Sequence, residues 1–289
     1  MLHAIAASLA LLILTLMTGS AKAEDVDDLP CQPARPCPVE DGDYLLRFPS
    51  DWDGRSRLPA VLFFHGYNSS ARTTFDSSSL RREFADHGYL VIAPDGARRA
   101  PDRPRGWPSM PLGNGVRDDL AFTDHVMADL RRRVPLDDEH ILVGGFSSGG
   151  SMAWYLACYR GSRYAGFVSI AGGLRNPHPE GACPDGPVRM FHIHGFTDPT
   201  VPLEGRRIGP WHQGDVFMSL DLLRHTNGCH SQPDRFEMGE TYRCRIWDTC
   251  SSGDDIRLCL HDGGHMLPPD WASMARNWFE SPTEPPAAN

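Results

Sequence analysis

The residues Gly145-Phe146-Ser147-Ser148-Gly149 place a serine between glycines that lie two positions before and two positions after it. This spacing is typical of a serine held at a sharp turn between a strand and a helix, where its hydroxyl projects clear of the sheet. The glycines are needed because side chains at their positions would collide with neighbouring backbone. We therefore predict that Ser147 is a nucleophile for acyl carbonyl groups, with the adjacent Ser148 as the alternative.

A nucleophilic serine needs a histidine as general base and a carboxylate that orients this histidine. Both candidates follow Ser147 along the chain, in the order serine, acid and histidine that accompanies this kind of turn. Asp198 lies in a loop after an apolar segment, and His265 follows two glycines that would let the backbone carry it over the serine. We predict Asp198 as the acid and His265 as the base. A turn-forming role for Asp198 and a base at His261 are the alternatives.

Acyl transfer also needs two backbone N–H groups that stabilise the oxyanion, one after the serine and one in the loop after an earlier strand. Ser148 supplies the first of these groups. We assign the second to Tyr67, because His65-Gly66-Tyr67-Asn68 follows an apolar segment and Gly66 permits a tight turn. An ordinary glycine turn beside a structural histidine is the alternative.

The remaining histidines predict no metal site. His192 and His194 alternate in an apolar segment, and no further ligands follow at a recognisable spacing. We therefore expect packing or loop roles for both, with no metal and no cofactor. The only lysine is Lys22. Because it precedes the predicted mature chain, mechanisms that need an amine at the site are excluded there.

Short apolar segments alternate with longer segments of helical periodicity, which is typical of a mostly parallel sheet with helices on both faces. The predicted strands are 44–48, 60–64, 89–92, 141–143, 167–170, 189–193 and 256–260. The predicted helices are 118–132, 150–158, 215–225 and 271–279. Two further segments, 98–115 and 234–253, hold many Pro, Gly and Asp residues, and we predict that both are loops near the mouth of the site.

Residues 1–23 contain an apolar run and end in Ala21-Lys22-Ala23, which is typical of an export signal cleaved before Glu24. An uncleaved membrane anchor is the alternative, because no Lys or Arg precedes the apolar run. We expect one catalytic domain over 24–280 and a disordered tail over 281–289. The protein is expected to be secreted or periplasmic and to leave the membrane once the signal is removed.

Eight cysteines behind an export signal predict disulfides, because an oxidising compartment forms and keeps them. We predict the pairs Cys31–Cys37 and Cys158–Cys183 and leave the other four cysteines open. The formal charge of −9 and the lack of a basic patch interleaved with aromatic residues argue against nucleic acid as a partner. The oligomeric state is left open.

Several segments together resemble the polyhydroxybutyrate depolymerase and feruloyl esterase family of secreted α/β-hydrolases, over most of the chain from about Tyr44 to Phe279. They are Phe64-His65-Gly66, Arg117-Asp118-Asp119-Leu120-Ala121-Phe122, the residues around Ser147, His194-Gly195 with Asp198 and Val201-Pro202, Asn227-Gly228-Cys229 and Gly263-Gly264-His265. The resemblance implies the α/β-hydrolase fold and a Ser147, Asp198 and His265 triad. It also implies a substrate pocket bordered by aromatic residues such as Trp107. The chain departs from the family after His265, where Met266-Leu267-Pro268 replaces the usual aromatic residue and glycine.

These observations predict a secreted serine hydrolase of carboxylic esters that acts on small or oligomeric esters. A peptidase or thioesterase on the same fold is one alternative, because the triad alone does not fix the leaving group. A binding protein that keeps this fold without turnover is the other. We assign Trp107 to substrate contact, with core packing as the competing interpretation.

Overall fold

Ten strands form one central sheet in a computed structural model that describes residues 29–108, 116–209 and 211–281. The strand order is β1-β2-β4-β3-β7-β8-β9-β14-β13-β12. The six middle strands run parallel. They are β4 (Leu90–Pro94), β3 (Leu58–Phe64), β7 (Leu136–Phe146), β8 (Gly166–Ile170), β9 (Met190–Gly195) and β14 (Ile256–His261). Their carboxyl ends therefore meet at one edge of the sheet, where ligands of open α/β sheets bind.

Antiparallel strands extend this sheet at both ends. β1 (Cys37–Val39) and β2 (Gly42–Arg47) lie beyond β4, and β13 (Tyr242–Trp247) and β12 (Arg235–Met238) lie beyond β14. Two short hairpins stand apart from the sheet. They pair β5 (Ala97–Arg98) with β6 (Arg105–Gly106) and β10 (Arg206–Ile208) with β11 (Trp211–Gln213).

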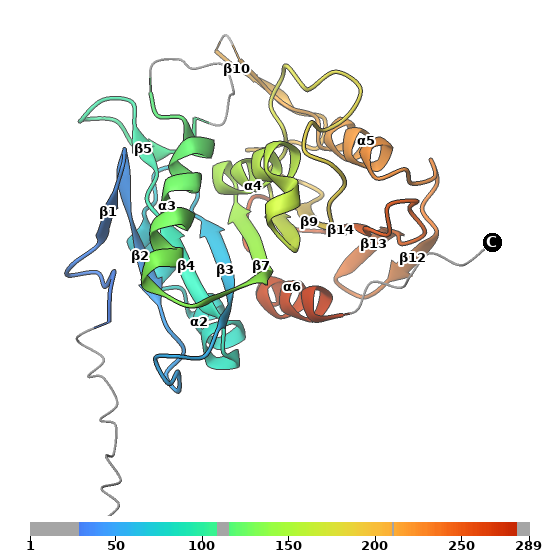
Figure 1. The fold of residues 1–289 in the computed structure, drawn as a ribbon. Coiled ribbons are helices and arrows are strands. Elements are labelled where there is room, and N and C mark those ends of the chain that lie inside the picture. Colours follow the sequence, from blue (N-terminus) through green and yellow to red (C-terminus); the bar gives the residue numbers. More distant parts are fainter. Residues whose placement is uncertain (1–28, 109–115, 210, 282–289) are drawn as a thin grey trace, which may run out of the picture.

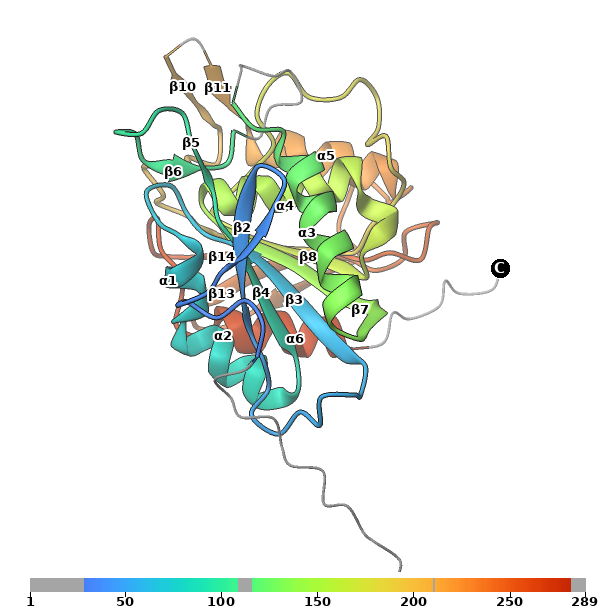
Figure 2. The same cartoon turned by 60° about the vertical axis from the view of Figure 1, so that its left-hand side comes forward.

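Helices cover both faces of the sheet (Figures 1 and 2). One face carries α3 (Asp119–Arg133), α4 (Ser148–Tyr159) and α5 (Val216–Thr226), and the other carries α1 (Ala71–Phe75), α2 (Ser78–Glu83) and α6 (Trp271–Glu280). Side chains of a strand alternate between the faces. Accordingly, Leu62 and Phe64 of β3 join the core under α3 and α4, whereas Val61 and Phe63 join the core under α6.

All seven predicted strands and all four predicted helices are present, although their bounds shift by a few residues. The interpretation of 234–253 as a loop near the mouth of the site is wrong, because this segment forms β12 and β13 at the far edge of the sheet. Exposed residues alternate with buried ones at the start of β13, and every residue of β12 is exposed. In both strands charged residues alternate with apolar ones, so these strands lack the continuous apolar runs by which the parallel strands were predicted.

All eight cysteines form disulfides. The predicted pairs Cys31–Cys37 and Cys158–Cys183 are confirmed. The other two are Cys229–Cys250 and Cys244–Cys259. The last of these joins β13 to β14 at residues that are direct partners in the strand register. It thereby ties the two edge strands to the strand that leads to His265.

The predicted export signal, residues 1–23, and residues 282–289 of the predicted tail lie outside the described part of the chain. Within the described part, none of the helices has the length and apolar character needed to span a bilayer. The assignment of 24–280 as one catalytic domain stays a prediction.

Candidate active site

Ser147 lies at the turn between β7 and α4, at the carboxyl edge of the sheet. Its backbone has φ 58° and ψ −119°, a conformation that residues with a side chain rarely adopt. The Ser147 amide donates to the Ile170 carbonyl at 2.9 Å, which holds the turn against the end of β8. Such strained residues persist where the surrounding structure fixes them, and they are concentrated at functional sites.

The glycines around Ser147 allow this turn to pack tightly. A Cβ atom on Gly145 would overlap the carbonyl oxygen of Gly149, and one on Gly149 would overlap the carbonyl oxygen of Phe64. Both obstacles are backbone atoms, which cannot rotate away as a side chain can. Glycine is therefore required at both positions.

The structure brings the predicted serine, histidine and acid together, although they follow three different strands, β7, β14 and β9. His265 Nε2 lies 2.9 Å from Ser147 Oγ, and His265 Nδ1 lies 2.7 Å from Asp198 Oδ2. Because an ionised carboxylate only accepts hydrogen bonds, Nδ1 carries the proton and Nε2 is free to accept the serine proton. His261, the alternative base, instead accepts the Gly263 amide at 3.0 Å and so helps to shape the turn before His265.

Asp198 is fully buried and uses its two carboxylate oxygens differently. Oδ1 accepts the amides of Thr200 and Val201, both at 2.8 Å, which is the turn-forming role considered as an alternative. Oδ2 faces His265. The two interpretations of Asp198 are thus compatible, because the turn fixes the carboxylate whose other oxygen faces the imidazole.

The two residues whose amides are predicted to stabilise the oxyanion, Ser148 and Tyr67, line the same cavity as Ser147. Ser148 begins α4, and its amide therefore has no acceptor within the helix. Within the described residues, the amide of Tyr67 donates no backbone hydrogen bond. A Cβ atom on the preceding Gly66 would lie 3.6 Å from Ser147 Cβ, so the Tyr67 loop passes close to Ser147.

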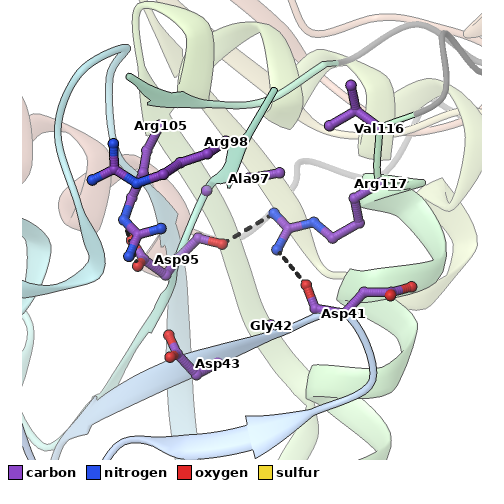
Figure 3. A pocket seen from close by; sticks show the side chains of 10 residues that line it. Asp41, Gly42, Asp43, Asp95, Ala97, Arg98, Arg105, Val116 and Arg117 are labelled. Atoms are coloured by element: carbon purple, nitrogen blue, oxygen red, sulfur yellow. Dashed lines mark hydrogen bonds and ion pairs between the residues drawn. The ribbon is translucent and has the colours of Figure 1, made fainter. Parts of the chain in front are cut away.

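A buried frame holds the Tyr67 loop in place. Trp107 Nε1 donates to the His65 carbonyl at 2.7 Å, and the Gly96 amide donates to His65 Nε2 at 2.9 Å. Arg117 braces the same region, since its guanidinium donates to the carbonyls of Asp41 at 3.1 Å and Asp95 at 3.0 Å (Figure 3). Because Asp95 precedes Gly96, Arg117 helps to hold the segment whose amide binds His65.

A cavity of about 660 Å³ opens beside Ser147, between the Tyr67 loop and the two hairpins. Trp107 borders it as predicted, but only 2% of its surface is exposed and its ring packs edge-on against Phe64. Trp107 therefore shapes the wall of the cavity but exposes little surface to a bound substrate. Other lining residues were not predicted, among them Arg175, Arg206 and Gln213. They come from a loop and a hairpin whose sequences carry no recognisable motif.

His192 and His194 form a buried chain of hydrogen bonds behind the acid. Trp154 Nε1 donates to His192 Nδ1 at 3.2 Å, His192 Nε2 lies 2.9 Å from His194 Nδ1, and His194 Nε2 lies 2.8 Å from the Val201 carbonyl. Because the indole only donates and the carbonyl only accepts, each imidazole is neutral and carries its proton on Nε2. His194 Nε2 also lies 3.5 Å from Asp198 Oδ2. No cluster suited to a metal ion occurs among the described residues.

Burial lowers the pKa of both His192 and His194 below the ordinary value of 6.5. The unfolded chain binds protons at these histidines as the pH falls below about 6.5, whereas the folded protein does not. The free energy of unfolding should therefore fall with decreasing pH, by up to about 1.4 kcal/mol per pH unit for each histidine. Asp119 opposes this fall in stability in part. Burial raises the pKa of its carboxyl group to about 6, so the folded protein binds a proton there at a higher pH than the unfolded chain does.

We expect the urea midpoint to fall between about pH 7.5 and pH 5.5, and to fall less steeply in His192→Gln. His230→Gln, which replaces an exposed histidine, is the matched control. Its urea midpoint should fall with decreasing pH as steeply as that of the unaltered protein. A slope that His192→Gln does not change would show that these histidines are not the groups that titrate.

The chain is similar to known esterases in sequence and in fold. The Phospholipase/Carboxylesterase family profile matches residues 119–210. Feruloyl esterase C of Emericella nidulans is 26% identical over 234 residues, which cover 77% of this chain and 76% of that protein. Among solved structures, an acetyl xylan esterase from Aspergillus awamori matches with a TM-score of 0.62 at 16% identity, over 82% of this chain and 93% of its own. A Bacillus cereus carboxylesterase matches with a TM-score of 0.54 at 14% identity, over 83% of this chain and 93% of that chain.

The mostly parallel sheet, its two helical layers and the strand-turn-helix around Ser147 define an α/β-hydrolase. Together with these relatives, they place the chain among the carboxylic ester hydrolases of that fold. Within this class, it is similar over about three quarters of its length to the feruloyl esterases.

Proposed function

We propose that the protein hydrolyses carboxylic esters through an acyl-enzyme on Ser147. The observation that carries the proposal is the hydrogen-bonded line from Asp198 through His265 to Ser147, with contacts of 2.7 and 2.9 Å, which ends at a cavity. The line thus offers a candidate nucleophile, a candidate base and a candidate orienting acid, each hydrogen-bonded to its neighbour, which supports the proposal.

In the first half of the reaction, His265 Nε2 takes the proton of Ser147 as Oγ attacks the ester carbonyl. Negative charge develops on the carbonyl oxygen, where the amides of Ser148 and Tyr67 stabilise it. His265 then returns the proton to the leaving alcohol as the C–O bond breaks. Asp198 keeps the imidazole oriented and stabilises its transient positive charge.

In the second half, a water molecule takes the place of the alcohol. His265 removes a proton from this water as its oxygen attacks the acyl group on Ser147. Collapse of the second tetrahedral intermediate releases the carboxylic acid and restores the serine hydroxyl. None of these steps calls for a cofactor.

We propose small or oligomeric esters as substrates, either feruloyl esters or hydroxyalkanoate oligomers. The feruloyl candidate is supported by the similarity to feruloyl esterase C, and the hydroxyalkanoate candidate by the motif resemblance to polyhydroxybutyrate depolymerases. A cavity of about 660 Å³ has the volume of a typical small-molecule site. We further propose that residues 1–23 direct export, which agrees with the four disulfides.

The proposal is tested with a fluorophosphonate probe, which bonds covalently to activated serines. The native protein should be labelled, Ser147→Ala should not, and Ser148→Ala should keep the label because Ser147 is intact. Hydrolysis of methyl ferulate, an acetylated sugar and hydroxybutyrate oligomers would then identify the ester. Absence of labelling in the native protein would refute the proposal. Turnover of a peptide or thioester but of no oxygen ester would reassign the leaving group.

A further inference from the structure

The cavity beside Ser147 is lined by arginine and by no acidic residue among the described positions. Arg99, Arg103, Arg175 and Arg206 border it together with the serine. The undescribed residues 109–115 and 210, which adjoin these lining segments in sequence, contain no charged side chain. The protein as a whole carries a formal charge of −9, so this positive lining runs against the overall charge.

Arg175 is the member of this set that has no carboxylate partner although its guanidinium is largely enclosed. The side chain is half-buried, and its Nε atom is buried without a hydrogen-bond partner among the described residues. Asp119 lies within electrostatic range and favours the charged arginine, but it forms no ion pair with Arg175: its Oδ1 is bound to Arg117 at 2.8 Å, and its Oδ2 is buried without a hydrogen-bond partner among the described residues. Arg99 adds a second positive charge nearby.

The backbone around Arg175 is firmly held next to the nucleophile. It lies in the loop after β8, where the Gly173 amide donates to Ser151 Oγ at 3.3 Å and the Leu174 amide donates to Ser219 Oγ at 3.1 Å. Tyr155, on the same helix α4 that Ser148 begins, donates to the Arg175 carbonyl at 3.4 Å. The position of this arginine relative to Ser147 is therefore set by the fold.

In the neighbouring pocket of Figure 3, two arginines have the carboxylate partner that Arg175 lacks within the described part of the chain. There, Arg105 pairs with Asp95 at 2.9 Å. Arg117, which lines the same pocket, pairs at 2.8 Å with Asp119, which the figure does not draw. An enclosed charge without a partner is costly, and removal of a partner from a buried ion pair is strongly destabilising. A ligand that brings its own negative charge would remove this cost, and the arginine fork matches the two oxygens of a carboxylate.

We propose that Arg175 binds a carboxylate of the substrate, so that the preferred substrates are esters that carry a free carboxylate near the scissile bond. Such esters include half-esters of dicarboxylic acids and hydroxyalkanoate oligomers with a free acid end. The inference rests on the proposed function, since it assigns the substrate class of the same cavity. Arg99 and Arg103 contribute a positive field that attracts such anions.

The test compares kcat/KM for matched charged and neutral esters. In the acyl arm, the 4-nitrophenyl half-ester of glutaric acid is compared with 4-nitrophenyl pentanoate. In the alcohol arm, the hydroxybutyrate dimer with a free acid is compared with its methyl ester. Spontaneous hydrolysis is subtracted with Ser147→Ala. We expect the native enzyme to prefer the charged ester at least about tenfold in one arm, and the arm identifies the side of the scissile bond that carries the carboxylate.

Arg175→Gln should lower this ratio by about 10- to 100-fold, and Arg175→Lys should restore part of it because it keeps the charge. Arg207→Gln is the matched control, since Arg207 precedes the lining residue Ile208, is exposed and does not line the cavity. It should leave the ratio unchanged. A ratio that Arg175→Gln does not alter would overturn the proposal.

A native enzyme that shows no preference for the charged ester in either arm would also overturn the proposal, whether or not the Arg175 variants fold. Fluorophosphonate labelling separates this failure from failure of the proposed function. Labelling and hydrolysis of neutral esters without charge preference refute only the carboxylate site. Absence of both labelling and ester hydrolysis in the native protein would refute the proposed esterase function itself.

Discussion

Replacing Asp198 with asparagine is expected to lower kcat for ester hydrolysis by about 10⁴-fold while the protein stays folded. The amide oxygen of the new side chain can still accept the amides of Thr200 and Val201, so the turn is kept. Its NH₂ group would face His265 Nδ1 and donate to it. His265 would then carry its proton on Nε2, which faces Ser147, and a protonated Nε2 cannot accept the serine proton.

Asp198→Ala separates the two functions of this side chain, because it also removes the acceptor of the two turn amides. Both variants should be slow, and only the alanine variant should show a large loss of thermal stability. Steady-state kinetics with a nitrophenyl ester and melting curves measure the two effects. A loss of kcat below about tenfold in Asp198→Asn would exclude Asp198 as the acid that orients the base.

Gly149→Ala is expected to disrupt the turn at Ser147, with a loss of about 3 kcal/mol or more in the free energy of unfolding. The added methyl group would overlap the Phe64 carbonyl oxygen and also press on the carbonyl of His65. Both carbonyls belong to backbone at the end of β3, so relief requires a shift of α4 away from the sheet. Such a shift would also move Ser147 from His265.

Gly173→Ala is the matched control for this change. The nearest atom to its new methyl group would be Val216 Cγ2 at 3.6 Å, which is an ordinary van der Waals contact. We expect a change within about 0.5 kcal/mol and normal fluorophosphonate labelling. Urea unfolding and labelling of the two variants side by side measure the contrast. Equal stability of both would show that the α4 backbone adapts to the methyl group without loss.

The parallel strands were predictable because each is buried on both faces and is therefore an apolar run bounded by turns. The first and last residues of these strands were harder to predict. β7 begins at Leu136, five residues before the predicted start, because Leu136 pairs with Leu58 of β3 across a register shift. The intervening polar residues give no sign of this pairing. β12 and β13 were missed although they pair with each other as neighbouring segments, because charged residues interrupt both strands and because Phe236 and Met238 of β12 are exposed.

The three residues of the hydrogen-bonded line were predictable because the chemistry restricts their types and the fold restricts their order along the chain. The groups around them were not. Arg175 lies near Ser147 only because α4 and α5 anchor the loop after β8. The chain from Trp154 to His194 likewise depends on the packing of a helix against a strand, and the sequence separation of 38 between Trp154 and His192 leaves no local pattern.

The hydrogen-bonded line joins residues that lie far apart in the chain, since His265 is 118 residues from Ser147 and 67 residues from Asp198. Contacts between such distant positions form late, because the intervening loops must close before they gain anything from pairing. Recovery of hydrolysis during refolding should therefore follow the slowest assembly step of the sheet and lag behind the return of helical signal. A fragment that ends before β14 lacks His265, the proposed base. Two fragments divided in the loop between β9 and β10 would regain activity only by assembling the sheet together.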